Sequence, residues 1–158
     1  MTGRHAVRAL ELLNLFFAGL LAGAEFAVRF GLRPAIGILE QQPSIVLRQA
    51  LIRSLRLVVP SVYLPTALTG AAVTVWNGGG SGFAAQCAAM AAVLVWTLAT
   101  FTGTVPINSA ILDGWQADAP PADWRATLRS WERLDTLRTA AAVAALALFL
   151  TAVGLQSA

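Results

Sequence analysis

Two carboxylates and an arginine stand out in this chain because they lie in or beside stretches that are otherwise apolar. Glu25 is near the end of an apolar run over residues 10–30, and Asp135 and Arg138 are at the start of another over residues 134–155. Charged residues inside membrane helices are costly and face the bundle interior or a wet cavity. There, a carboxylate can act as a general base and a guanidinium can stabilise a developing oxyanion. Glu25, Asp135 and Arg138 are therefore the candidate catalytic residues.

Helical spacing adds two side chains to this set. Asn14 precedes Glu25 by eleven residues, which is almost three helical turns, so both lie on one stripe of the first helix. Trp131 shares a face with Asp135 and Arg138, and the last two are three residues apart and able to pair. Asn14 and Trp131 are therefore predicted to contact a substrate.

The second and third apolar runs contribute further polar residues. Arg56, Pro60 and Tyr63 share one helical face, and Pro60 and Pro65 free backbone carbonyls that neighbouring donors or water must satisfy. Asn108 lies beside a proline at the end of the third run, where its amide needs partners. The candidate substrate-binding residues are thus Asn14, Arg56, Tyr63, Asn108 and Trp131.

The elements that hold these residues are four long apolar segments, at about residues 10–30, 57–75, 83–105 and 134–155. Each approaches the ~20 residues that a helix needs to cross a hydrocarbon core. The composition, 57% hydrophobic and 12% charged with a mean hydropathy of +0.67, is typical of an integral membrane protein. We predict an all-α fold: a transmembrane four-helix bundle forming one domain over residues 1–158, with an amphipathic interfacial helix leading into the fourth span.

Charge asymmetry predicts how the bundle is inserted. The chain has no lysine, and nine of its arginines occupy or flank the connections 31–56 and 106–133. The positive-inside rule places these connections in the cytoplasm and both termini outside, and we expect a bacterial plasma membrane. In the alternative interpretation the N-terminus is a signal peptide, with Ala22-Gly23-Ala24 as its cleavage site.

Alternating helix directions bring the polar residues to one leaflet. The end of span one, the start of span two, the end of span three and the start of span four lie on the same side. We therefore expect a polar pocket near one membrane face, and no comparable set of residues at the opposite face.

Several other classes of site are not indicated. The only histidine, His5, lies in the N-terminal tail, and Cys87 falls near the other membrane face. No metal site is therefore predicted, although Glu25 and Asp135 could offer oxygens to a hard ion. Glycine fingerprints for nucleotide cofactors and basic stripes for nucleic acids are absent. Without an inverted repeat a transporter is a weak alternative, and the sequence is compatible with a homo-oligomer.

Three stretches resemble the anthrone oxygenase-like family of small four-helix membrane proteins. They are Gly19 to Phe30 with Arg33-Pro34, Thr104 to Asn108 with Trp115, and Trp124 to Thr139. The positions that match are Glu25, Pro106, Asn108, Trp131 and Arg138, whereas Asp135 stands where many relatives have histidine. The resemblance implies oxidation of an anthrone to an anthraquinone without an evident cofactor.

The resulting hypothesis is an oxygenase that acts on a small apolar aromatic substrate, anthrone-like or phenol-like, with no organic cofactor and with molecular oxygen as co-substrate. Glu25 or Asp135 would be the base, Arg138 or Arg56 would stabilise the oxyanion, and Asn108 and Tyr63 would orient the substrate oxygen. The alternative is a non-enzymatic membrane protein, a partner subunit or a small-ligand binder, in which these charges fix the helix register.

Overall fold

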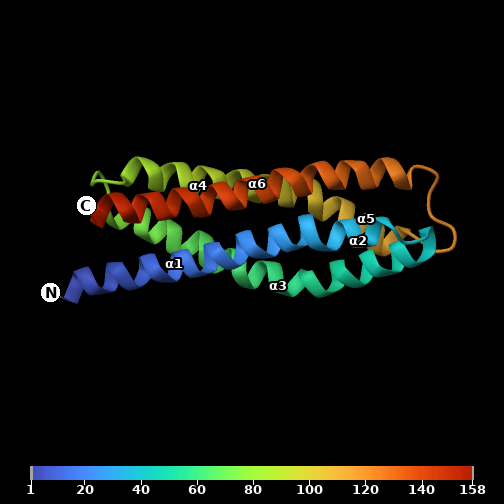
Figure 1. The fold of residues 1–158 in the computed structure, drawn as a ribbon, viewed down its shortest axis with the longest axis horizontal. Helices are drawn as coiled ribbons and strands as arrows, with labels where there is room; N and C mark the ends of the chain where they lie inside the picture. The colour runs from blue at the N-terminus through green and yellow to red at the C-terminus, as the bar shows by residue number, and fades with distance from the viewer. Residues whose placement is uncertain (1, 158) are drawn as a thin grey trace.

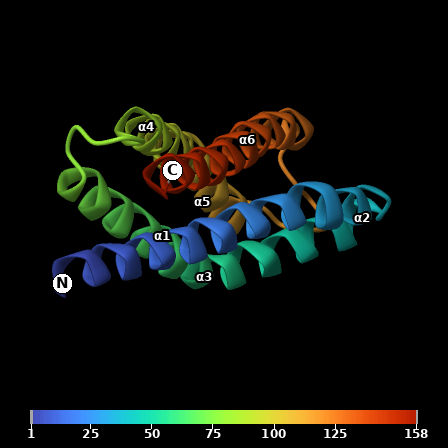
Figure 2. The same ribbon diagram turned by 60° about the vertical axis from the view of Figure 1, so that its left-hand side comes forward.

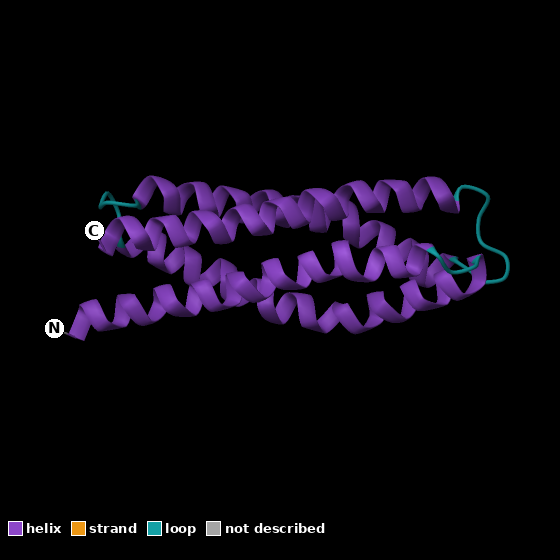
Figure 3. Ribbon diagram, viewed as in Figure 1, coloured by secondary structure: helices purple, strands orange, loops and turns teal. Residues whose placement is uncertain are grey.

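The computed structural model describes residues 2–157, and every described segment with regular structure is helical. Several helical segments continue directly into the next one, so the chain forms four continuous helical rods joined by turns and a loop (Figures 1 and 3). The first joins α1 (Thr2–Phe26), the π-helix η1 (Ala27–Leu32) and α2 (Arg33–Gly37). The second is α3 (Gln41–Trp76), the third joins α4 (Phe83–Leu98), the π-helix η2 (Ala99–Thr104) and α5 (Val105–Gly114), and the fourth is α6 (Trp124–Ser157). The predicted all-α four-helix bundle is confirmed.

The four rods are long and apolar enough to cross a membrane. Their outer surface exposes large apolar side chains such as Phe16 (59%), Leu68 (69%) and Leu94 (57%), which suits contact with lipid rather than water. The 36 residues of α3 extend over about 54 Å, well beyond a hydrocarbon core of ~30 Å. The bundle therefore continues past the hydrocarbon, and the predicted interfacial helix is simply the first part of α6.

The rods pack as two layers, α1 with α3 and α4 with α6, and α1 joins the layers by also packing on α6 (Figure 2). The layers approach each other closely at Gly70 of α3. A Cβ atom there would lie 2.8 Å from Met90 Sδ, 3.1 Å from Asn14 Nδ2 and 3.1 Å from Phe149 Cζ. The Gln86 amide nitrogen also donates to the Gly70 carbonyl oxygen at 3.2 Å. Glycine is thus required where all four rods meet.

The fully buried residues of helix α3 fall in two separate zones. Its buried residues are confined to Ser44–Ile52 and Thr66–Val73, and none lies between them. Pro60 and Pro65 fall in or beside this unburied stretch, where each removes a backbone N–H and permits a bend. Arg56 is in the same stretch and is exposed, so the prediction that it joins the polar pocket is wrong.

A polar layer lies between the hydrophobic cores along α6, and it consists of Glu25, Arg33, Arg48, Glu132, Asp135, Arg138 and the N–H group of Trp96. On the side of the layer towards the C-terminus of α6, in the more apolar part of the bundle, one core is formed by Leu21, Ala22, Trp96, Ala141 and Ala142. On the side towards the N-terminus of α6, a second core is formed by Ile45, Ile52, Ile111, Trp115 and Leu128. The Gln49 amide nitrogen closes this second core by donating to the carbonyl oxygens of Ile111 and Trp115, both at 3.0 Å.

The opposite end of the bundle has a polar contact between side chains of three rods. The Asn77 amide nitrogen donates to Glu11 Oε1 at 3.1 Å and to Gln156 Oε1 at 3.2 Å. This contact ties the turn after α3 to both termini of the bundle. It contains no arginine, so it is a smaller set than the polar layer at the other end.

Candidate functional site

The helical stripe on α1 carries Glu25 into the bundle, as predicted. Asn14, Ala18, Ala22 and Glu25 are all buried, with exposed fractions of 3%, 2%, 4% and 5%. The π-helix η1 begins two residues after Glu25. Its i→i+5 bonds widen each turn and therefore change the register of every residue that follows.

This change of register brings in Arg33, which sequence periodicity did not select. Arg33 follows Glu25 by eight residues, and in an uninterrupted α-helix the two would face about 80° apart. After η1 the Arg33 side chain is only 12% exposed and reaches the same interior.

Glu25 is held by two donors from different rods. It forms an ion pair with the Arg138 guanidinium of α6, and it accepts a hydrogen bond from Trp96 Nε1 of α4 at 3.0 Å. The Arg138 guanidinium also lies over the Trp96 ring, 5.0 Å from its centroid. Its Nε–H is buried and has no acceptor among the described residues. Arg138 therefore has one N–H donor that is not hydrogen-bonded within the described residues and that lies beside a buried carboxylate.

Aromatic rings continue this group towards α3. The Tyr63 ring stacks on Trp96 with centroids 4.8 Å apart and an angle of 25°, and its hydroxyl lies 2.9 Å from the Thr97 hydroxyl. Residues from all four rods, Glu25, Tyr63, Trp96 and Arg138, thus meet in one place. Of the residues predicted to gather, the structure brings together Glu25, Tyr63 and Arg138, with Trp96 as the contribution of the third rod, and we call these four residues the Glu25 group.

Asp135 belongs to a second ion-pair group one helical turn away on α6. Arg33 contacts two carboxylates, Asp135 Oδ2 at 3.2 Å and Glu132 Oε2 at 3.1 Å. Asp135 is only 2% exposed. The prediction that Asp135 pairs with Arg138 is wrong, because the register after η1 offers Arg33 to Asp135 and leaves Arg138 for Glu25.

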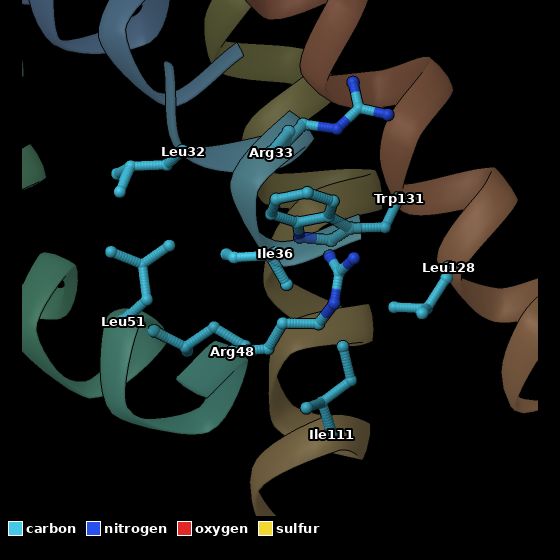
Figure 4. Close-up of a pocket in the computed structure, with 9 residues that line it drawn as sticks. Leu32, Arg33, Ile36, Arg48, Leu51, Ile111, Leu128 and Trp131 are labelled. Carbon is cyan, nitrogen blue, oxygen red and sulfur yellow. The ribbon is translucent and has the colours of Figure 1, made fainter. Parts of the chain in front are cut away.

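A small hollow opens beside this second group (Figure 4). Its lining includes Leu32, Arg33, Ile36, Arg48 and Trp131. The space open to the centre of a water-sized sphere is about 10 Å³, which is near the minimum for one water molecule. Trp131 Nε1 donates to Asn108 Oδ1 at 3.0 Å, so these two predicted residues fix each other at the edge of the hollow.

Two of the predicted substrate-binding residues lie elsewhere. The Asn14 amide nitrogen donates to the Thr66 carbonyl oxygen at 3.0 Å and to the Thr69 hydroxyl at 3.1 Å, so Asn14 joins α1 to α3 about 16 Å along the helix from Glu25. Arg56 is exposed, as described above. Tyr63 belongs to the Glu25 group, whereas Asn108 and Trp131 contact each other at the hollow.

Four members of the polar layer were not selected from sequence: Arg33, Arg48, Trp96 and Glu132. Trp96 did carry a signal, because an indole N–H inside an apolar run needs an acceptor. Arg33 and Arg48 lie in the segment predicted as a connection, and Glu132 lies in the predicted interfacial helix. Their inward orientation depends on helix register, which spacing alone could not reveal across a π-helix.

The geometry suits proton abstraction next to oxyanion stabilisation, since buried carboxylates and guanidinium donors lie side by side. Over the described residues, no three His, Cys, Asp or Glu side chains come together as a metal-binding group.

No family model, curated protein or solved structure matches this chain. The resemblance to the anthrone oxygenase-like family therefore stays a prediction that depends on the residues quoted above.

Proposed function

We propose that this protein is a membrane-embedded oxygenase that oxidises a small apolar aromatic substrate bearing an acidic C–H bond, such as an anthrone, with molecular oxygen. The observation that carries the proposal is the buried Arg138 Nε–H, which lies beside the Glu25 carboxylate and has no acceptor among residues 2–157. A substrate oxygen would supply the missing acceptor.

The proposed chemistry needs only groups of this chain and oxygen. Glu25 removes a proton from the CH₂ group next to the aromatic rings, and the negative charge spreads onto the substrate oxygen held by Arg138. The carbanion then gives its electrons to O₂ and forms a C–O bond, and the peroxide takes up a proton. Loss of water from the hydroperoxide leaves a carbonyl group, so CH₂ and O₂ become C=O and H₂O.

The aromatic pair would orient the substrate. Tyr63 and Trp96 already stack on each other, and offset stacking of aromatic rings contributes about 0.5–1.5 kcal/mol beyond area burial. A flat tricyclic substrate can continue this stack. Asp135, held by Arg33, is the alternative base in the neighbouring group.

Access from the lipid is proposed past the unburied stretch of α3. The Glu25 group is covered on this side by Val59, Val62 and Tyr63, all only partly buried. Pro60 and Pro65 lower the cost of bending there. On the positive-inside rule the site lies near the cytoplasmic face.

Oxygen uptake by purified protein with an anthrone tests the proposal. Glu25→Gln is expected to lower the rate by about 100-fold or more, in line with the contribution of a general base, and Asp135→Asn to lower it less. Glu11→Gln is the matched control, because Glu11 is on the same rod and also accepts an amide hydrogen bond. Full turnover in both Glu25→Gln and Asp135→Asn would remove the base assignment.

A second candidate is a non-enzymatic role for the same residues. It is favoured by one observation: Glu25 and Asp135 are already paired with arginines, as in a network that only fixes helix register. This role predicts no oxygen consumption above that of empty micelles for the wild type with anthrones or phenols.

A further inference from the structure

Arg48 of α3 is a buried cation without a carboxylate of its own. Its exposed fraction is 7%. Its Nε–H is buried with no acceptor, and over the described residues it forms no hydrogen bond or ion pair. Its guanidinium lies over the Trp131 ring, with 5.7 Å between the guanidinium carbon and the ring centroid. A cation–π contact only partly offsets the loss of water from a guanidinium.

The carboxylates of the polar layer are engaged with other arginines. Glu132 and Asp135 bind Arg33, and Glu25 binds Arg138. Glu132 lies close enough to Arg48 to attract it, but its carboxylate is bonded to Arg33. Arg48 therefore feels the charge of Glu132 at a distance, but over the described residues no carboxylate accepts a hydrogen bond from its buried Nε–H.

Arg48 points into the hollow described above. Figure 4 shows its side chain extending from α3 towards Trp131, with Ile36 and Leu128 nearby. Arg33 lines the same hollow, so two guanidinium groups are within one small space. Its room for about one water-sized group suits a single anionic oxygen, with the remainder of the ligand at the mouth. An aromatic ring is too large for it.

The surroundings of the hollow match a lipid headgroup. Leu32, Ile36 and Leu51 form apolar lining, and Leu32 is 41% exposed on the outer surface of the bundle. Trp131 precedes Arg138 by seven residues, so the hollow lies about 10 Å further along α6 than the Glu25 group. This places it where headgroups follow the hydrocarbon core.

We propose that Arg48, with Arg33, binds a phosphate oxyanion in this hollow, supplied by an anionic phospholipid or by free phosphate. This site is distinct from the Glu25 group and does not depend on the proposed oxygenase activity. Arginine suits it because its planar fork recognises phosphate through paired N–H bonds.

Thermal denaturation of the delipidated protein in neutral detergent tests the proposal with three probes. Short-chain phosphatidic acid, inorganic phosphate and a diacylglycerol with the same acyl chains are each added to the wild type, Arg48→Gln and Arg56→Gln. Arg56→Gln is the matched control, since Arg56 is an exposed arginine on the same helix. Phosphatidic acid is expected to raise the midpoint temperature of unfolding equally in the wild type and in Arg56→Gln. For Arg48→Gln, the same rise is expected to need at least a tenfold higher concentration of phosphatidic acid.

Each outcome decides the matter. A shift with phosphatidic acid alone identifies a lipid phosphate, whereas an equal shift with inorganic phosphate identifies the free ion. An equal response of Arg48→Gln and wild type, a response to diacylglycerol as large as that to phosphatidic acid, or no response of the wild type to either phosphate overturns the proposal.

A second measurement uses the unaltered protein, in case Arg48→Gln does not fold. Photoactivatable phosphatidic acid is crosslinked to the wild type and the adducts are mapped. Adducts concentrated on residues 32–51 support the site, and adducts spread evenly over the lipid-facing surface overturn it.

Discussion

At the scale of single residues, Glu25 and Arg138 compensate each other's charge in the interior of the bundle. Each partner is nearly inaccessible, and each is further fixed by Trp96 through an N–H bond or a ring contact. Removing one partner of a buried pair leaves the other charge uncompensated, which typically costs about 3–5 kcal/mol, whereas replacing both with neutral groups is often tolerated.

Arg138→Met alone is therefore expected to lower the free energy of unfolding by about that amount. The double variant Glu25→Gln/Arg138→Met should recover most of the loss, because Gln can still accept the Trp96 hydrogen bond. Unfolding in mixed micelles measures both. Arg129→Met, an exposed position on the same helix, should change little. A double variant no more stable than Arg138→Met would mean that the pair does not act as a unit.

The residues of the site were predictable to the extent that they break an apolar pattern. Glu25, Asp135 and Arg138 stand out because charge is rare in membrane helices. Their pairing was not predictable, since it depends on side-chain register after η1. Arg33 shows the reason. Composition assigns its segment to a connection, but in the structure the segment continues the first rod, and the wider turns of η1 orient the Arg33 side chain towards Asp135.

At the scale of helices, the point where all four rods approach one another depends on Gly70. Gly70→Ala is expected to destabilise the protein by about 1–3 kcal/mol, the usual cost of overpacking, because the added methyl group would meet Met90, Asn14 and Phe149. Gly19→Ala is the matched control, since its Cβ would meet nothing within 4 Å. Thermal midpoints in detergent compare the two. Equal midpoints would show that the rods can separate at Gly70 without cost.

The helices themselves were more predictable than their contacts. Runs of apolar residues predict four spans, and the structure has four rods in those places. The sequence did not indicate that α3 has fully buried residues only in two separate zones, with partly buried contacts such as Tyr63 in between. Prolines predicted a bend, but its direction depends on which faces of α3 find partners, and that is a property of the whole bundle.

At the scale of the whole molecule, the bundle places a polar layer between a membrane core and a second apolar core. The second core, around Ile45 and Ile111, explains why the rods exceed the hydrocarbon thickness. They carry packed structure beyond the membrane, so the ion pairs are enclosed on both sides. The sequence predicts connections at residues 31–56 and 106–133, because their arginines lower the mean hydropathy. Each of these segments nevertheless contributes apolar side chains to the second core.

The same architecture makes the sidedness of the site testable. Figure 1 places both termini and the turn after α3 at one end, and α2, α5 and the loop before α6 at the other. The positive-inside rule predicts that the second end is cytoplasmic. In a Cys87→Ala background, a membrane-impermeant maleimide is expected to label Ser81→Cys in intact cells. Asp118→Cys should react only after permeabilisation.

Both positions are exposed loop residues, so differences in labelling report sidedness rather than burial. The reverse pattern would put the arginine-rich end outside. The Glu25 group would then lie at the outer leaflet, and a substrate made in the cytoplasm would have to cross the bilayer before reaching Glu25. Since an apolar aromatic molecule partitions into lipid, oxidation could still occur, but Arg48 would face the outer leaflet and its phosphate ligand would have to come from there.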